Sequence, residues 1–267
     1  MPNATMVPML FLLSPAKTLD YDTPVRAPVL KKATDPLFTD RAAELIDVLR
    51  QKSPAQVASL MDLSDKLAAL NVARYGAWQP EATPANSKPA VLAFNGDVYE
   101  GLDAKTLKAA DLAWAQEHLV ILSGLYGALR PLDRLQPYRL EMGTALATPR
   151  GKDLYAYWGD TVADHLNERL AGEKSPVVVN LASVEYARVA LRQTLTARVV
   201  DCQFEERKGG GYKVISFFAK QARGMMARYA IEHRVRRPEQ LRGFNAGGYV
   251  LAPEMSTPER LVFRRGA

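Results

Sequence analysis

The sequence feature that most constrains the fold is a series of short apolar runs rich in Val, Leu, Ile and Phe. Several runs are unbroken rather than alternating, which is typical of strands covered on both faces. We therefore expect most of them to be buried strands. The predicted strands are Met9–Leu13, Ala90–Phe94, His118–Ser123, Val177–Ala182, Ala197–Phe204, Tyr212–Phe218 and Arg260–Arg265.

Stretches with helical spacing lie between these runs, so the chain is predicted to be a mixed α/β protein. The predicted helices are 35–51, 53–70, 103–117, 153–172 and 217–235. Ser53 is the expected N-cap of the second, with Pro54 in its first turn. No internal repeat or low-complexity tract is present, and we expect one compact domain over residues 1–267.

Composition indicates the cellular compartment and the class of binding partner. A single cysteine, Cys202, excludes an intramolecular disulfide and favours a reducing cytoplasm. The apolar run near the start is too short to span a bilayer, so no membrane partner is expected. Residues 201–267 contain 13 Lys and Arg against 7 Asp and Glu, whereas residues 1–200 contain 22 of each. Such localised charge suits a polyanion binder, although a merely solvated basic surface has the same composition.

The motifs of common cofactor and metal chemistry are missing. His118, His165 and His233 are far apart in sequence and form no metal-spaced set with Cys202. There is no G-x-S-x-G elbow, Walker A loop or dinucleotide fingerprint. We therefore predict neither a cofactor nor a metal site.

Polar residues follow three of the predicted strands. Ser14, Lys17 and Thr18 follow the first, Asn95-Gly96-Asp97 the second, and Ser183-Val184-Glu185-Tyr186 the fourth. Side chains at strand ends commonly line a cleft, which would make Lys17 a phosphate ligand or a catalytic amine. The alternative is that these residues only terminate the strands and that Lys17 is a surface lysine.

The stretch 118–143 combines two glycines with three arginines and allows two interpretations. Either His118–Ser123 is a buried strand followed by a turn, or 122–135 is a hairpin between two short helices. In both cases Gly124 and Gly127 could let the backbone approach a phosphate, with arginines close by. We therefore predict a phosphate-facing turn, in which Arg130, Arg134 and Arg139 supply the charge; the alternative is a turn with only a packing role.

The predicted helix 217–235 is the best-defined basic element. Lys220, Arg223, Arg228 and Arg234 fall within an arc of roughly 140°. The opposite side is expected to face the core and carries Phe218, Ala222, Met225, Met226 and Tyr229.

Eight motifs in order carry a resemblance to the YaaA peroxide-stress family. They are LLSPAKTLDY, SDKLAALN, NGDVYEGL, LSGLYGALRPLDRLQPYRLEMG, GKDLYAYWGD, NLASVEY, ISFFAKQARG and GFNAGGY. The resemblance extends from Met9 to about Arg264, so residues 1–8 are a short N-terminal extension. The chain departs from the family at Phe218 and Gln221, where a Tyr and a Lys are common.

The resemblance implies a single α/β domain of the cantaloupe fold, with a positively charged cleft and a helix-hairpin-helix-like element. It implies a cytoplasmic protein of the hydrogen peroxide response that binds duplex and structured DNA with little sequence preference and limits iron damage. No settled enzymatic activity and no obligate protein partner come with it. The candidate DNA-binding residues are Lys17, Lys66, Gly124, Tyr126, Gly127, Arg130, Arg134, Arg139, Lys220, Arg223 and Arg228.

Three functions compete. The first is a DNA-binding stress protein, favoured by the basic quarter of the chain and the arginines of the glycine turn. The second is an enzyme of unknown reaction that acts on a nucleic acid or a small molecule at the polar strand ends. The third, direct iron binding, is the weakest because ordered sets of metal ligands are missing.

Overall fold

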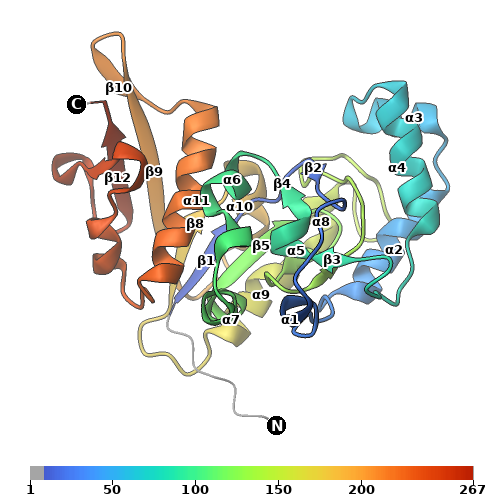
Figure 1. Ribbon diagram of the computed structural model, residues 1–267. Helices are drawn as coiled ribbons and strands as arrows, with labels where there is room; N and C mark the ends of the chain where they lie inside the picture. The colour runs from blue at the N-terminus through green and yellow to red at the C-terminus, as the bar shows by residue number, and fades with distance from the viewer. Residues whose placement is uncertain (1–8, 267) are drawn as a thin grey trace.

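The predicted buried strands form the centre of a mixed sheet (Figure 1). The computed structural model describes residues 9–266. β1 (Met9–Leu13) lies between β8 (Val177–Leu181) and β5 (Leu119–Ser123) and is parallel to both. β9 (Arg198–Lys208) and β12 (Arg260–Arg265) continue the parallel part beyond β8.

Antiparallel strands complete the sheet. β6 (Gly127–Leu129) pairs with β5, β11 (Val250–Leu251) with β12, and β10 (Gly211–Lys213) with β9. The order is β11-β12-β9-β8-β1-β5-β6, with β10 beside β9. The predicted α/β class is therefore confirmed. Two small ladders lie apart from this sheet: β2 (Thr18–Leu19) with β4 (Phe94–Asn95), and β3 (Lys88–Pro89) with β7 (Arg134–Leu135).

Helices cover both faces of the sheet. α6, α7 and α11 lie in front of it in Figure 1, whereas α9 and α10 lie behind it. None of the helices in residues 9–266 is long and apolar enough to cross a membrane. The α-helices are α1 (Ala27–Leu30), α2 (Thr39–Arg50), α3 (Pro54–Met61), α4 (Asp65–Ala77), α5 (Ala90–Ala93), α6 (Asp97–Leu102), α7 (Ala109–His118), α8 (Leu154–Trp158), α9 (Thr161–Arg169), α10 (Val184–Ala190) and α11 (Ser216–Glu232). The described part of the chain also has the short 3₁₀ helices η1 (Ala104–Thr106), η2 (Pro238–Gly243), η3 (Ala246–Gly248) and η4 (Pro253–Met255).

Two of the predicted strands are wrong in whole or in part. Residues Ala90–Phe94 form helix α5, and only Phe94 enters a strand. All four residues of α5 are buried, and a buried helical turn has the same unbroken apolar pattern as a buried strand. In Tyr212–Phe218 the strand ends at Lys213, and α11 already begins at Ser216.

Three of the predicted helices are interrupted or shortened at left-handed residues. Asp62 (φ 50°) separates α3 from α4, and Gly159 (φ 51°) separates α8 from α9. Asp103 (φ 45°) precedes η1, so the helix expected from residue 103 begins only at Ala109. The predicted cap is confirmed: Ser53 accepts a hydrogen bond from the Gln56 backbone, and the Gln56 side chain accepts one from Ser53 in return.

The glycine turn at 124–127 connects two strands. β5 leads into it and β6 leads out of it, so the strand interpretation of this stretch is confirmed and no helices flank the turn. A helical hairpin lies elsewhere, where the three residues 62–64 join α3 to α4. These two helices stand at the right of Figure 1, away from the sheet.

Candidate functional site

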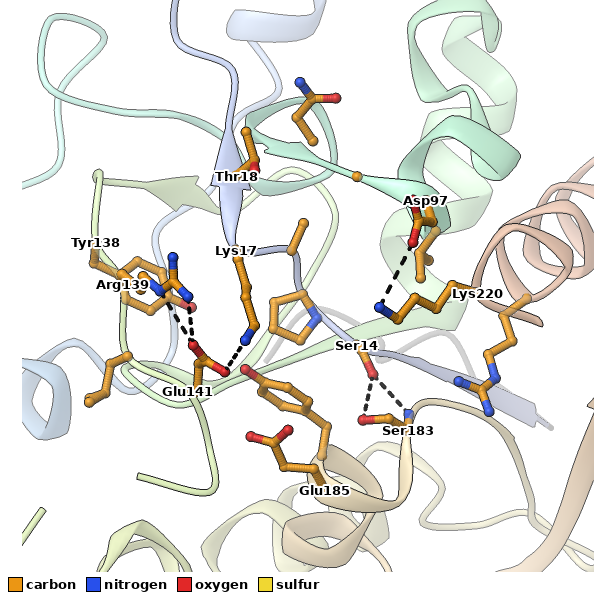
Figure 2. Close-up of a pocket in the computed structure, with 18 residues that line it drawn as sticks. Ser14, Lys17, Thr18, Asp97, Tyr138, Arg139, Glu141, Ser183, Glu185 and Lys220 are labelled. Carbon is orange, nitrogen blue, oxygen red and sulfur yellow. Dashed lines mark hydrogen bonds and ion pairs between the residues drawn. The ribbon is translucent and has the colours of Figure 1, made fainter. Parts of the chain in front are cut away.

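A polar cavity lies at the carboxyl ends of two strands, where the chain changes direction within the sheet. From β1 the chain proceeds to β5 on one side, and β8 then joins β1 on the other side. In open α/β sheets, ligands bind at the carboxyl ends of the strands at such a switch point. A cavity of about 490 Å³ opens there, beyond the ends of β1 and β8. Its walls come from five segments, shown in Figure 2: 14–18, 95–98, 138–141, 183–186 and the first half of α11.

Two serines join the strand ends at the floor of the cavity. The Ser183 backbone N–H donates to Ser14 Oγ (2.8 Å), and Ser14 Oγ donates to Ser183 Oγ (3.3 Å). The Ser14 carbonyl accepts a hydrogen bond from the buried Tyr99 hydroxyl (3.0 Å). These bonds hold the ends of β1 and β8 side by side, with both hydroxyls at the cavity (Figure 2).

Acidic and basic side chains alternate around the walls. Lys17 Nζ lies 2.6 Å from Glu141, which also accepts a hydrogen bond from Arg139 (3.0 Å). Burial alone would raise the pKa of Glu141, but the hydrogen bonds from Lys17 and Arg139 outweigh it and lower the pKa, so this side chain is a carboxylate. Glu185 accepts a hydrogen bond from the Gly143 backbone (2.9 Å).

Helix α11 supplies the remaining basic groups. Lys220 approaches Asp97 only loosely, at 3.8 Å (Figure 2). Arg223 also lines the cavity, but within residues 9–266 it forms no hydrogen bond and no ion pair closer than 4.0 Å. Burial lowers the pKa of its guanidinium, and only Cys202 and Asp201 oppose this shift.

Close packing between α11 and α6 sets the position of these two cations. A Cβ atom on Gly224 would lie 1.8 Å from the Val98 carbonyl oxygen, and one on Gly101 would lie 2.0 Å from that of Gln221. Both contacts are to backbone, so no larger residue fits without moving a helix. Glycine is costly in the middle of a helix, and this close packing explains why Gly224 stands there.

The structure gathers only some of the predicted site residues. Lys17, Arg139, Lys220 and Arg223 line the cavity, whereas Lys66 lies on α4 and is not part of its walls. The predicted basic face of α11 does not exist as one surface. Arg228 instead pairs with Asp103 and Glu232, and Arg234 lies beyond the helix and pairs with Asp111.

The arginines after the glycine turn are engaged within the fold. Arg130 pairs with the buried Asp133 (3.0 Å), and Arg134 pairs with Asp35 (2.8 Å). Desolvation raises the pKa of Asp133, against the opposing effect of Arg130. Both arginines therefore have structural partners that the sequence did not suggest.

The turn itself is buried. A Cβ on Gly124 would meet the Leu140 carbonyl oxygen at 2.2 Å, and one on Gly127 would meet the Trp158 ring at 2.7 Å. Tyr126 is also buried and accepts a hydrogen bond from Trp78 Nε1 (2.8 Å). Close packing therefore explains both glycines, since a side chain at either position would collide with its neighbours. The expectation of a phosphate-facing turn is not met, because residues 124–127 are all buried.

A second group of cations lies at the opposite end of the sheet and was not anticipated. Lys174, Arg198, Arg236 and Arg237 surround a hollow next to Val177, at the start of β8. Within residues 9–266, no three His, Cys, Asp or Glu side chains are arranged to hold a metal ion. Cys202 is buried, and burial raises the pKa of its thiol well above the usual range.

Comparison with known proteins identifies similar chains. Residues 9–255 match the model of a family described as peroxide stress protein YaaA. A protein of Leptothrix cholodnii named "UPF0246 protein" is 69% identical over 257 residues, which is 96% of this chain and 98% of the relative. Relatives with names of the same kind from Albidiferax ferrireducens and Bordetella pertussis are each 63% identical over 257 residues, again 96% of this chain, and 98% and 99% of the relatives.

Proposed function

Because the chain belongs to the peroxide stress protein YaaA family, we propose that it binds duplex and structured DNA without sequence preference during the response to hydrogen peroxide. The proposed surface is the rim of the switch-point cleft, with the tip of the α3–α4 hairpin as a second contact. Bound protein would shield DNA from oxidation and so limit the toxicity of intracellular iron.

The observation that carries the proposal is the exposure of the two rim lysines. The side chains of Lys17 and Lys220 are 63% and 51% exposed. Glu141 keeps its bond from Arg139 when Lys17 leaves, and Asp97 lies 3.8 Å from Lys220, so each exposed lysine can exchange its carboxylate for a DNA phosphate. Phosphate contacts of this kind position a protein on DNA without reading its sequence. Arg130 and Arg228 are less suited, because each is committed to partners within the fold.

The hairpin between α3 and α4 adds a third exposed cation. Lys66 lies in the first turn of α4, after the left-handed Asp62 and the exposed Ser64. Backbone N–H groups at the start of a helix favour anions, and Lys66 adds to that attraction, although Asp65 opposes it. We therefore include Lys66 in the surface, and leave out the buried residues Gly124, Tyr126 and Gly127.

A salt-titrated binding assay with a matched control tests the proposal. The variant Lys17→Ala with Lys220→Ala removes two charges at the rim. Arg236→Ala with Arg237→Ala removes two charges at the other end of the sheet. With a fluorescent duplex, the logarithm of the association constant falls as the logarithm of the salt concentration rises. This negative slope should become shallower by about two units for the rim variant and stay unchanged for the control.

Two results contradict the proposal. Equal weakening by both double variants would mean that only net charge matters and that the cleft has no special role. A strong preference of the unmodified protein for one duplex sequence at moderate salt would refute binding through phosphates alone.

A further inference from the structure

The floor of the cleft has the properties of a small-molecule site, which shares Lys220 with the exposed rim. Its volume of about 490 Å³ lies within the range of roughly 300–1,000 Å³ that is usual for ligand pockets. It also occupies the topological switch point, beside the joined ends of β1 and β8. A duplex lying across the rim does not need such depth.

Arg223 is the most informative group in the cavity. Arg139, the other arginine that lines the cavity, has a carboxylate partner in Glu141, and Arg228, further along α11, has one in Glu232. Arg223 is half-buried and has none within 4.0 Å in the described part of the chain. A desolvated charge without a partner is costly, and an anionic ligand is the natural group to compensate it. The planar guanidinium also presents paired donors that match two oxygens of one phosphate.

The neighbouring groups indicate the charge of that anion. Lys220 lies one helical turn before Arg223 and is held only loosely by Asp97, so it can turn towards the same anion. Two cations suit the double charge of a phosphate monoester better than the single charge of a carboxylate or of a backbone phosphodiester. The Ser14 and Ser183 hydroxyls add polar groups on the same cavity.

The opposite wall indicates the rest of the ligand. Glu141 is a carboxylate and Glu185 has one oxygen free of the bond from Gly143, so both can accept hydrogen bonds from a hydroxyl or an amine. The close contact of Gly224 with Val98 fixes Arg223 relative to the wall formed by Asn95–Val98. A rigid site loses less entropy on binding than a flexible one.

We propose that this cavity binds a phosphate monoester bearing hydroxyl or amino groups, with Arg223 and Lys220 on the phosphate and Glu141 and Glu185 on the remainder. The monoester is either a free nucleotide-like molecule or the 5′-terminal phosphate of a DNA strand. The proposal does not depend on duplex binding at the rim.

Calorimetric titration of the full chain tests the site with deoxyadenosine 5′-monophosphate, deoxyadenosine and inorganic phosphate. The monophosphate should bind saturably, inorganic phosphate more weakly, and the nucleoside not at all. Arg223→Gln should weaken monophosphate binding by about 10- to 100-fold, as expected for loss of a charge-assisted hydrogen-bond pair. Arg236→Gln, at the other end of the sheet, should leave it unchanged.

Thermal unfolding separates binding from a structural role of Arg223. Because the variant removes an uncompensated charge, the ligand-free Arg223→Gln protein should melt no lower than the unmodified protein. A lower melting temperature with unchanged monophosphate affinity would overturn the proposal. Absence of saturable monophosphate binding at millimolar concentration would overturn it as well.

Oligonucleotides distinguish the two sources of the monoester and keep this proposal apart from duplex binding. If the ligand is a DNA end, a 5′-phosphorylated single strand should bind more tightly than its 5′-hydroxyl form, and Arg223→Gln should abolish the difference. If the ligand is a free molecule, both strands should bind alike while the monophosphate still depends on Arg223. Failure of a 5′-hydroxyl duplex to bind would count against the rim proposal alone.

Discussion

Replacing Gly127 by alanine should lower stability and leave DNA affinity unchanged. Gly127 has φ +66°, and an added Cβ would lie 2.7 Å from the buried Trp158 ring. The left-handed conformation costs an alanine about 1–2 kcal/mol, and overpacking of the core costs roughly 1–3 kcal/mol. Together they predict a loss of about 2–5 kcal/mol. For a domain of this size that corresponds to a fall of roughly 5–15 °C in melting temperature.

Gly209→Ala is the matched control. Gly209 has nearly the same backbone angle, φ +64°, but no atom lies within 4 Å of its added Cβ. This variant should lose only the conformational part, about 1–2 kcal/mol. The difference between the two variants in thermal unfolding therefore measures the contact with Trp158. Equal melting temperatures for the two variants, together with weaker DNA binding by folded Gly127→Ala protein, would show that the turn contacts phosphate and that the packing argument is mistaken.

Two further predictions concern buried titratable groups. Arg130→Ala should destabilise the protein by roughly 1–3 kcal/mol, because it removes the guanidinium contacts with the buried Asp133 carboxylate, while the bond from the backbone N–H of residue 130 remains. Since burial raises the pKa of Asp133, the deficit in melting temperature should shrink as acid protonates this group, and a constant deficit would refute the assignment. Burial lowers the pKa of His118 and His165 to about 4, below the usual value of about 6.5. As the pH falls, the unfolded chain therefore binds these protons first, and stability should decrease from about pH 6.5 to pH 4. Thermal melts should show a smaller fall for His165→Gln than for the unmodified protein, and identical pH profiles would contradict this.

The sequence was sufficient where local pattern and burial coincide. The unbroken apolar runs of β1, β5 and β8 identified the central strands, because strands covered on both faces lack polar positions. The same pattern failed at Ala90–Ala93, where it belongs to a buried helix. Ser53 predicted the start of α3, because an N-cap needs only a hydrogen bond to the first turn of the same helix, here from the Gln56 backbone N–H. The polar residues after β1 and β8 were correctly expected to meet, since the carboxyl ends of neighbouring parallel strands lie at one edge of the sheet.

Only the tertiary structure decided which charged groups are free to bind. Lys17 pairs with Glu141 and Arg130 pairs with Asp133. The sequence around each residue would be the same if its side chain faced solvent, so it does not predict these partners. The glycine turn illustrates the same limit. Gly124 and Gly127 fit a phosphate contact and a packed turn equally well in sequence, and the positions of Leu140 and Trp158, brought close by the fold, decided for packing. The local sequence determines the conformation of a segment. The residues that surround the segment depend on how distant parts of the chain pack, and this packing determined which residues form the site.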